Sequence, residues 1–227
     1  MPEGVSVTLS SGVINKQQVI RPYFGVDIQK YFFTEQEAYF NFTGRFGTFY
    51  RNSRMEDMDA LVNLDYFSRL VSLGHWKQRS FLSAGITAQV NTVLNTPLFL
   101  TSPFGLPELP VDTTVSGNVR MTLRGESVFF SPLRIANFHF APFIFTDLCL
   151  FTPDTDPLSK SNLYSAIGGG VRTRNESLIF GTIELRGFYF PRKDYFFHES
   201  WRIDISSNLR FKYNTQLIRR PELIQVN

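Results

Sequence analysis

Polar and apolar residues alternate with a period of two through most of Gly117–Phe211, in one segment after another. The segment Ser200–Tyr213 shows the pattern most clearly, because Trp201 and Ile203 share one parity while Arg202 and Asp204 take the opposite one. Successive side chains of a β-strand point to opposite sides. Each such segment is therefore predicted to be a strand with one face towards an apolar medium and the other towards water.

Ten segments are predicted to be strands of this kind. They are Val5–Val13, Ile20–Phe33, Ala38–Arg51, Ala60–Leu73, Ser80–Asn91, Gly117–Phe130, Asn137–Phe151, Leu163–Arg174, Ile179–Phe190 and Ser200–Tyr213. At about 3.3 Å per residue, a strand of about 11–14 residues spans roughly 36–46 Å, enough for a tilted crossing of a lipid bilayer. Strands of soluble proteins average about 5–6 residues. The lengths therefore favour an all-β fold, an antiparallel transmembrane β-barrel.

The two faces of the predicted strands differ in chemistry in the same way along the chain. The apolar parity includes Phe24, Ile28, Phe40, Phe42, Val62, Leu64, Leu82, Ile86, Met121, Leu123, Phe138, Phe140, Ile144, Ile183 and Leu185. The opposite parity includes Asp27, Arg45, Asp65, Arg69, Arg120, Arg124, Glu126, Asp147, Arg172, Arg174, Glu184 and Arg186, so it holds more basic than acidic residues. The first set is predicted to face lipid and the second the lumen. A soluble β-sandwich or a lipocalin-like barrel, with the apolar face buried, is the alternative.

Composition excludes several other classes of protein. The chain has 227 residues, 24 of them Phe, yet charged residues make up 19 % and the mean hydropathy is −0.10. It contains no run of about 18 apolar residues, so transmembrane helices are excluded. A net charge of +3 without a basic arm argues against a nucleic-acid partner. The single cysteine, Cys149, excludes an internal disulfide, and no clustered metal ligands or cofactor motif are found.

The N-terminal residues Met1–Val5 have neither the basic nor the apolar region of an export signal. An outer-membrane protein needs such a signal, so we interpret residues 1–227 as a single barrel domain that is part of a longer protein.

The connections between the predicted strands are expected to alternate between the two ends of the barrel. One end would have the longer loops, Asn15–Gln18, Asn52–Asp59, Thr92–Ser116, Thr152–Asn162 and Pro191–Glu199, and the other short turns. The 25-residue segment Thr92–Ser116 is unusually long for a loop without secondary structure. Because it contains Phe99, Phe104, Leu106 and Leu109, it is predicted to pack inside the lumen.

Local motifs in the second half suggest a family. Gly117–Glu126, Phe143–Asp147, Tyr164–Arg172 and Ile179–Arg192 resemble strands of the bacterial surface antigen superfamily, the barrels of outer-membrane assembly and two-partner-secretion translocators. The resemblance implies a sixteen-strand barrel whose long sixth loop enters the lumen and is followed by five strands. Five predicted strands precede and five follow Thr92–Ser116, so the chain would be the C-terminal part of such a barrel, without its first six strands and its periplasmic domains.

The resemblance also implies where the functional residues lie. The family's loop carries a Val-Arg-Gly-Phe-type tetrad, whose Arg contacts acids on the twelfth and thirteenth strands. The corresponding loop motif is Gly105, Leu106, Pro107, Glu108 and Leu109, and the corresponding wall residues are Arg120, Arg124, Glu126, Asp147 and Arg172. Pro107 stands where the Arg is expected. We therefore expect Phe104, Leu106 and Leu109 to hold the loop by packing, with Glu108 pairing with a basic residue such as Arg124.

The function expected from the resemblance is assistance in inserting or secreting client proteins at the bacterial outer membrane. The partners would be outer-membrane lipid, unfolded clients and subunits of an assembly complex; a passive transport or structural barrel is the alternative. An enzyme is not expected, because His75, His139 and His198 are scattered. His139 and Asp147 share a parity, but eight residues of strand separate them by about 26 Å.

Overall fold

The alternating segments form the long strands of one antiparallel sheet. The computed structural model describes residues 3–35, 37–109, 115–153, 157–175, 180–192 and 199–209. The strands are β1 (Gly4–Lys16), β2 (Val19–Phe33), β3 (Tyr39–Arg51), β4 (Arg54–Phe67), β5 (Val71–Leu73), β6 (Trp76–Val90), β7 (Leu98–Phe99), β8 (Ser116–Phe130), β9 (Arg134–Ile135), β10 (Phe138–Pro153), β11 (Asn162–Asn175), β12 (Phe180–Tyr189) and β13 (Trp201–Leu209). The described part of the chain also holds one helical turn, η1 (Leu158–Lys160), and no helix long and apolar enough to cross a membrane.

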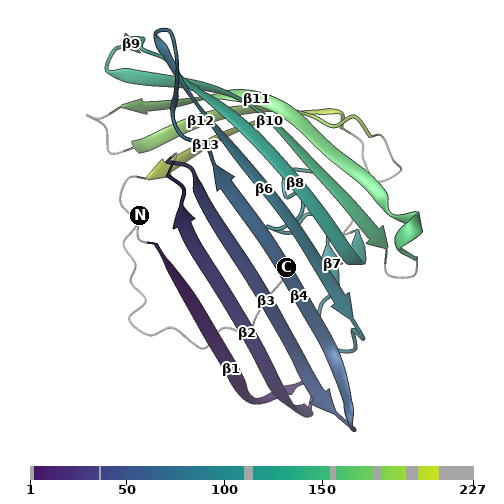
Figure 1. Ribbon diagram of the computed structural model, residues 1–227. Helices are drawn as coiled ribbons and strands as arrows, with labels where there is room; N and C mark the ends of the chain where they lie inside the picture. Colours follow the sequence, from purple (N-terminus) through teal and green to yellow (C-terminus); the bar gives the residue numbers. More distant parts are fainter. Residues whose placement is uncertain are drawn as a thin grey trace.

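Each long strand pairs with its neighbour in the chain. The sheet order is β1-β2-β3-β4-β6-β8-β10-β11-β12-β13, and the short strands β5, β7 and β9 pair with β6, β8 and β10. The sheet curves along this order, from β1 at one edge to β13 at the other (Figure 1). No ladder joins β13 to β1 within the described residues. The all-β antiparallel prediction is confirmed, whereas the closed barrel and its sixteen strands stay predictions.

The ten predicted strands correspond to the ten long strands, but one predicted loop is wrong. Residues Asn52–Asp59 do not form a loop, because β4 begins at Arg54 and only Asn52 and Ser53 turn the chain. Both have positive φ, 50° and 60°, which is the conformation of a tight hairpin turn that Asn tolerates well.

The end of the sheet that was expected to have the longer loops therefore has two tight turns. The β1–β2 turn also consists of two residues, Gln17 and Gln18. At the opposite end, the predicted strand Ala60–Leu73 is interrupted after Phe67, and the short hairpins β5–β6 and β9–β10 prolong the sheet. Loop length alone consequently does not tell the two ends apart.

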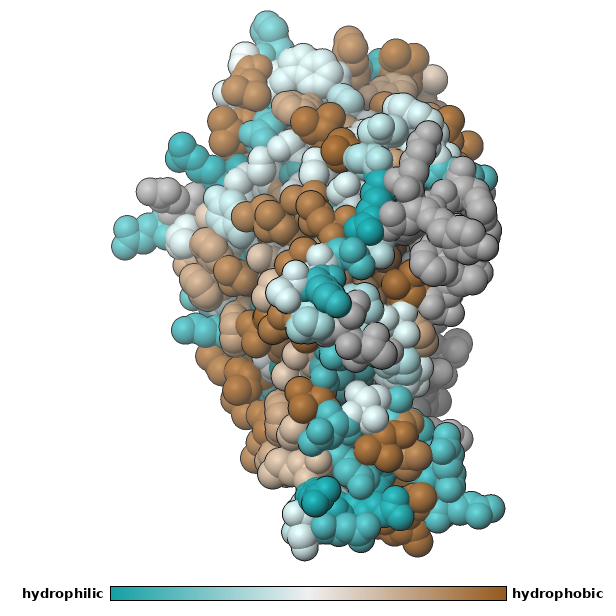
Figure 2. Space-filling model, turned by 90° about the vertical axis from the view of Figure 1, so that its right-hand side faces the viewer, coloured by the Kyte–Doolittle hydropathy of each residue, from teal (hydrophilic) through white to brown (hydrophobic). Residues whose placement is uncertain are grey.

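The predicted apolar parity lies on the exposed, convex face of the sheet. Leu123 is 45 % exposed, whereas its neighbours Thr122 and Arg124 are partly buried on the concave side. The same holds for Ile20, Phe24, Ile28, Val62, Leu64, Leu82, Ile86, Met121, Ile144, Leu150, Ile183, Leu185, Ile203 and Ile205. Apolar side chains cover much of the middle of the face drawn in Figure 2. An apolar surface that repeats on strand after strand is far larger than the patches of ordinary soluble monomers.

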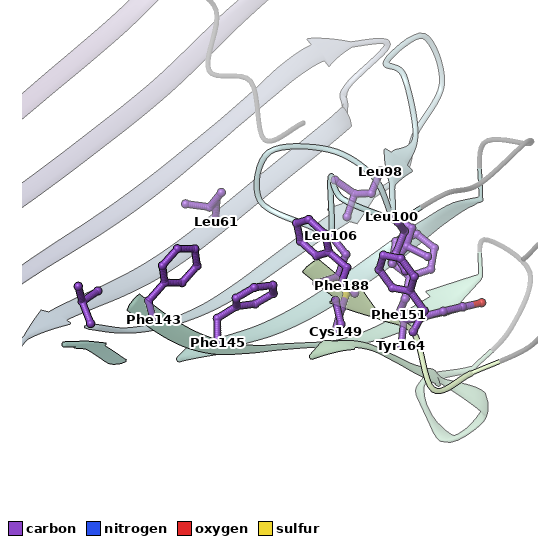
Figure 3. Packing of buried hydrophobic residues seen from close by; sticks show 14 residues of the cluster. Leu61, Leu98, Leu100, Leu106, Phe143, Phe145, Cys149, Phe151, Tyr164 and Phe188 are labelled. Carbon is purple, nitrogen blue, oxygen red and sulfur yellow. The ribbon is translucent and has the colours of Figure 1, made fainter. Parts of the chain in front are cut away.

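The core of the molecule lies on the concave face of β10, β11 and β12. There the inward parity is apolar, unlike the polar lumen that was expected. The buried side chains are Phe143, Phe145, Cys149, Phe151, Tyr164, Ala166 and Phe188 from these strands, Phe190 directly after β12, Leu61 and Val128 from β4 and β8, and Leu98, Leu100, Leu106 and Leu109 from the segment after β6. Figure 3 shows Phe143 and Phe145 of β10 pointing from the sheet into the concave side, with Leu61 above Phe143.

Candidate functional site

The segment that links β6 to β8 folds back on itself against the concave face. We call its described residues 92–109 the inner loop. Strand β7 pairs with the first residues of β8, and the amide of Leu106 donates to the carbonyl of Leu100 at 2.7 Å. Gly105 makes this close approach possible, since a Cβ there would lie 2.0 Å from the carbonyl oxygen of Leu100. The loop is therefore a compact, hydrogen-bonded unit.

A buried carboxylate on β4 holds the start of the inner loop. Asp57 accepts hydrogen bonds from the backbone amides of Val93, Leu94 and Asn95 at 2.5, 3.0 and 3.2 Å. Its other partner is Arg21 of β2, which is almost completely buried, with 2.6 Å between Nη1 and Oδ2. Charge-assisted hydrogen bonds of this kind are about twice as strong as neutral ones. The sequence did not reveal this anchor, because Asp57 fell within a predicted loop.

Two wall arginines hold the middle of the inner loop. Arg120, fully buried, donates to the carbonyl of Phe99 at 2.7 Å and to the hydroxyl of Ser102. Arg124, four residues further along β8 and on the same face, donates to the carbonyls of Pro103 and Gly105. Both arginines were predicted as lumen-wall residues, and the structure brings both to the loop. They bind its backbone, so this contact does not require a particular side chain in the loop motif.

Within the loop motif, the two leucines pack into the apolar cluster. Leu106 is fully buried and Leu109 is 5 % exposed, and both belong to the apolar cluster, whereas Pro107 is exposed. Phe104 packs against the same cluster, with the Arg45 guanidinium 6.0 Å from its ring centroid. The expected packing of these side chains is therefore present.

The expected pair between Glu108 and Arg124 is not formed. Arg124 is occupied by loop carbonyls, and these two described residues share no ion pair. The Glu108 carbonyl accepts from Arg202 of β13 at 3.1 Å, while its carboxylate atom Oε2 is buried without a hydrogen bond. The physical reason for the difference is that the loop backbone turns its carbonyls, rather than a side chain, towards β8.

The wall acid Glu126 forms an ion pair with another of the predicted wall residues. Arg172 of β11 binds it with two hydrogen bonds, 2.5 Å from Nη1 to Oε1 and 2.8 Å from Nη2 to Oε2. The same guanidinium binds Glu184 of β12 at 2.6 Å, and Arg186 pairs with Glu184 as well. This four-residue wall network lies over Phe143, whose ring centroid is 4.3 Å from the Arg172 guanidinium. Arg172 was among the predicted wall residues.

The second predicted wall acid, Asp147, has no such partner. It lies on β10 opposite Arg124 of β8 and is only 9 % exposed. No described residue donates a hydrogen bond to it or pairs with it within 4 Å. His139 lies on the same strand, paired with Arg174, and the described residues contain no group of three or more His, Cys, Asp or Glu arranged to hold a metal ion.

The predicted site residues thus separate into three groups by contact. Arg120 and Arg124 bind the inner loop, Glu126 and Arg172 bind each other, and Asp147 has no partner among the described residues.

Compared with family models, curated proteins and solved structures, the chain shows no match to any of them.

Proposed function

We propose that this chain forms the wall of a bacterial outer-membrane β-barrel of the protein-assembly or translocation type. The observation that carries the proposal is the contrast between the two faces of one sheet. The convex face exposes apolar side chains on successive strands, and the concave face bears the wall network, the wall arginines and the inner loop. This is the arrangement of a strand wall with lipid on one side and an aqueous lumen on the other.

The lengths of the strands fit a membrane crossing. Strands β1 to β4, β6, β8, β10 and β11 contain 13–16 residues each. At about 3.3 Å per residue, 13 residues extend over roughly 43 Å. Hydrocarbon offers no partner to backbone amides and carbonyls, so strands that cross it must belong to a closed sheet. In the proposal, the free edges of β1 and β13 are joined in the membrane, to each other or through further strands.

The assembly or translocation role rests on two features together. One is the inner loop, seated against the concave face five long strands from the end of the described sheet, where the resemblance to the surface antigen superfamily implies an inserted loop. The other is the pair of sheet edges at β1 and β13, which no ladder joins within the described residues. Where the seam at such an edge opens, the backbone groups of the edge strand can pair with a client strand by β-augmentation.

A passive barrel is the second candidate, and the firmness of the loop anchors favours it. Asp57, Arg120 and Arg124 hold the inner loop at separate points, and Leu106 and Leu109 seat it in the core. A loop held in this way restricts the lumen whether or not clients ever pass.

Cross-linking to a client distinguishes the two candidates. The chain is reconstituted in lipid vesicles with a photo-reactive amino acid in place of Ser207 on the edge strand β13, and an unfolded outer-membrane protein is added. A matched variant carries the same amino acid in place of Asn63 on β4, in the middle of the sheet. Client adducts at position 207 and not at 63 are expected. Solute flux without client adducts at either position would contradict the assembly role and support the passive barrel.

A further inference from the structure

A pocket of about 290 Å³ opens beside the inner loop on the concave face. It is enclosed by Glu108 of the loop and by residues from β4, β6, β8, β10 and β12. Three of the residues that line it are aromatic, Phe67, Phe81 and Phe145. The other lining side chains that matter here are charged: Asp65, Arg124, Glu126, Asp147 and Arg186.

The charges around the pocket do not balance. Glu126 and Glu184 are neutralised by Arg172 and Arg186 within the wall network. Asp65 receives its hydrogen bonds from neutral groups, the amides of Asn41 and Asn63 and the hydroxyl of Ser83, at 3.0, 2.9 and 2.6 Å. These contacts satisfy oxygen atoms of Asp65 but leave its charge in place.

Three carboxylates, those of Asp65, Glu108 and Asp147, therefore face one remaining guanidinium, that of Arg124, which is already bound to two loop carbonyls. The pocket is locally acidic although the chain as a whole is basic.

Asp147 is the feature that points to a ligand. Its side chain is more than nine-tenths buried, lines the pocket, and has no hydrogen-bond or ion-pair partner among the described residues. The Oε2 atom of Glu108, which lines the same pocket, is buried and also lacks a hydrogen bond. Burying a carboxylate without a partner is costly, so such groups in proteins are normally paired. Two carboxylates of this kind in one pocket indicate a cationic partner that is not one of the described residues.

The aromatic walls indicate which kind of cation. Phe67 and Phe81 meet edge to face, with their centroids 5.1 Å apart, and Phe145 lines the same pocket. Aromatic faces attract organic ammonium and guanidinium groups, which give up their hydration more readily than a small metal ion does. The described residues also offer no cluster suited to a metal ion.

The geometry points to a binding site for an organic cation, with a guanidinium or primary ammonium head group placed between Asp147 and Glu108 against the phenylalanine walls. The head group belongs to a free small molecule or to an Arg or Lys side chain of a polypeptide in the lumen. The inference does not depend on the proposed function, because the pocket is formed by the concave face alone.

Titration of the folded full chain in detergent micelles tests the site. The probes are n-butylguanidinium, its neutral isostere n-butylurea, and a short blocked peptide with a single Arg, followed by calorimetry. We expect n-butylguanidinium to bind at least ten-fold more tightly than n-butylurea. Tighter binding of the peptide than of n-butylguanidinium would identify a polypeptide as the source of the head group, and weaker binding a small molecule.

Two variants and a control locate the binding. Asp147→Asn and Glu108→Gln keep the side-chain shapes and are each expected to weaken binding of n-butylguanidinium ten-fold or more. Asp27→Asn, which removes a carboxylate on β2 that pairs with Arg45 of β3 and is absent from the pocket lining, is expected to leave it unchanged. The inference would be overturned if the charged and neutral probes bound with equal affinity or if neither bound. It would also be overturned if Glu108→Gln and every folded preparation of Asp147→Asn bound n-butylguanidinium with wild-type affinity.

Discussion

The first four strands and the strands from β10 to β12 obey the same alternation, yet their concave faces are built differently. On β2 to β4 the concave side is polar, with Arg21, Asp27, Arg45 and Asp57 in ion pairs. On β10 to β12 it is largely aromatic and covered by the inner loop. The difference teaches that alternation specifies which residues share a face, but the partner that covers the face determines whether it can be apolar.

The aromatic residues follow the same division. In the first half they stack near one end of the strands, as in the pairs Phe32–Phe40 and Phe40–Tyr66, with centroids 5.1 and 4.9 Å apart. In the second half Phe145 and Phe188 meet edge to face in the buried core, at 5.2 Å. Aromatic residues of the first half thus gather mainly near the strand ends, apart from the buried pair Tyr23 and Phe49, whereas those of the second half fill the concave side.

The largest expected effect breaks the core of the second half. Phe188→Ala removes a side chain that is 1 % exposed and is expected to lower the free energy of unfolding by about 3–5 kcal/mol. Phe46→Ala on β3 is the matched control, since Phe46 is 38 % exposed on the convex face. Denaturant titration of both variants in detergent measures the difference. Equal losses would mean that the concave cluster does not form the core.

The second prediction tests the face that the two halves share. Leu123→Arg and Ile205→Arg place a charge on the convex face and are expected to cost about 2–4 kcal/mol in a bilayer, since lipid solvates charge poorly. Their neighbours Thr122→Arg and Ser206→Arg serve as controls. Folding yield in lipid vesicles reports the effect. A soluble chain that tolerates all four substitutions alike would refute the membrane assignment.

The third prediction concerns the loop that distinguishes the second half. Gly105→Ala forces a methyl group against the Leu100 carbonyl and is expected to cost about 1–3 kcal/mol. Gly125→Ala, on β8, meets only the Leu82 side chain at 3.9 Å and should be close to neutral. Protection of the Leu106 amide from hydrogen exchange would fall in the first variant alone. Unchanged protection in Gly105→Ala would show that the loop is not seated as described.

The smallest effects separate the two wall acids. Glu126→Gln weakens a hydrogen-bonded pair with Arg172 and is expected to cost about 1 kcal/mol, reduced by the partial exposure of the pair. Asp147→Asn removes a buried charge without a partner, so the unliganded protein should keep or slightly gain stability. Parallel unfolding titrations compare them. A larger loss for Asp147→Asn would reveal a partner of the carboxylate.

The ten long strands and their apolar face could be predicted from the sequence, because both depend on local alternation. Placement of the inner loop also had a local signal, the apolar residues Phe104, Leu106 and Leu109 in a long connection. The anchor at Asp57 had none. Glu56, Asp57 and Asp59 read as a polar loop, and only Arg21 and the amides of the distant inner loop make them suitable for a strand.

The polar contacts of the inner loop were predicted with the wrong chemical groups. A search for side-chain partners leads to Glu108 and Arg124, whereas the guanidiniums of Arg120 and Arg124 bind carbonyl oxygens that every residue carries. Backbone acceptors leave no trace in the sequence, so contacts of this kind cannot be found from residue types.

The attachment of the inner loop at its start and at its middle has a mechanical consequence. Asp57 fixes its start to β4, while Arg124 and the buried leucines fix its middle to β8 and the strands beyond. The loop is thus a brace across the concave side that resists changes in the curvature of an otherwise open sheet. Releasing either attachment would let the concave trough of the sheet widen or flatten.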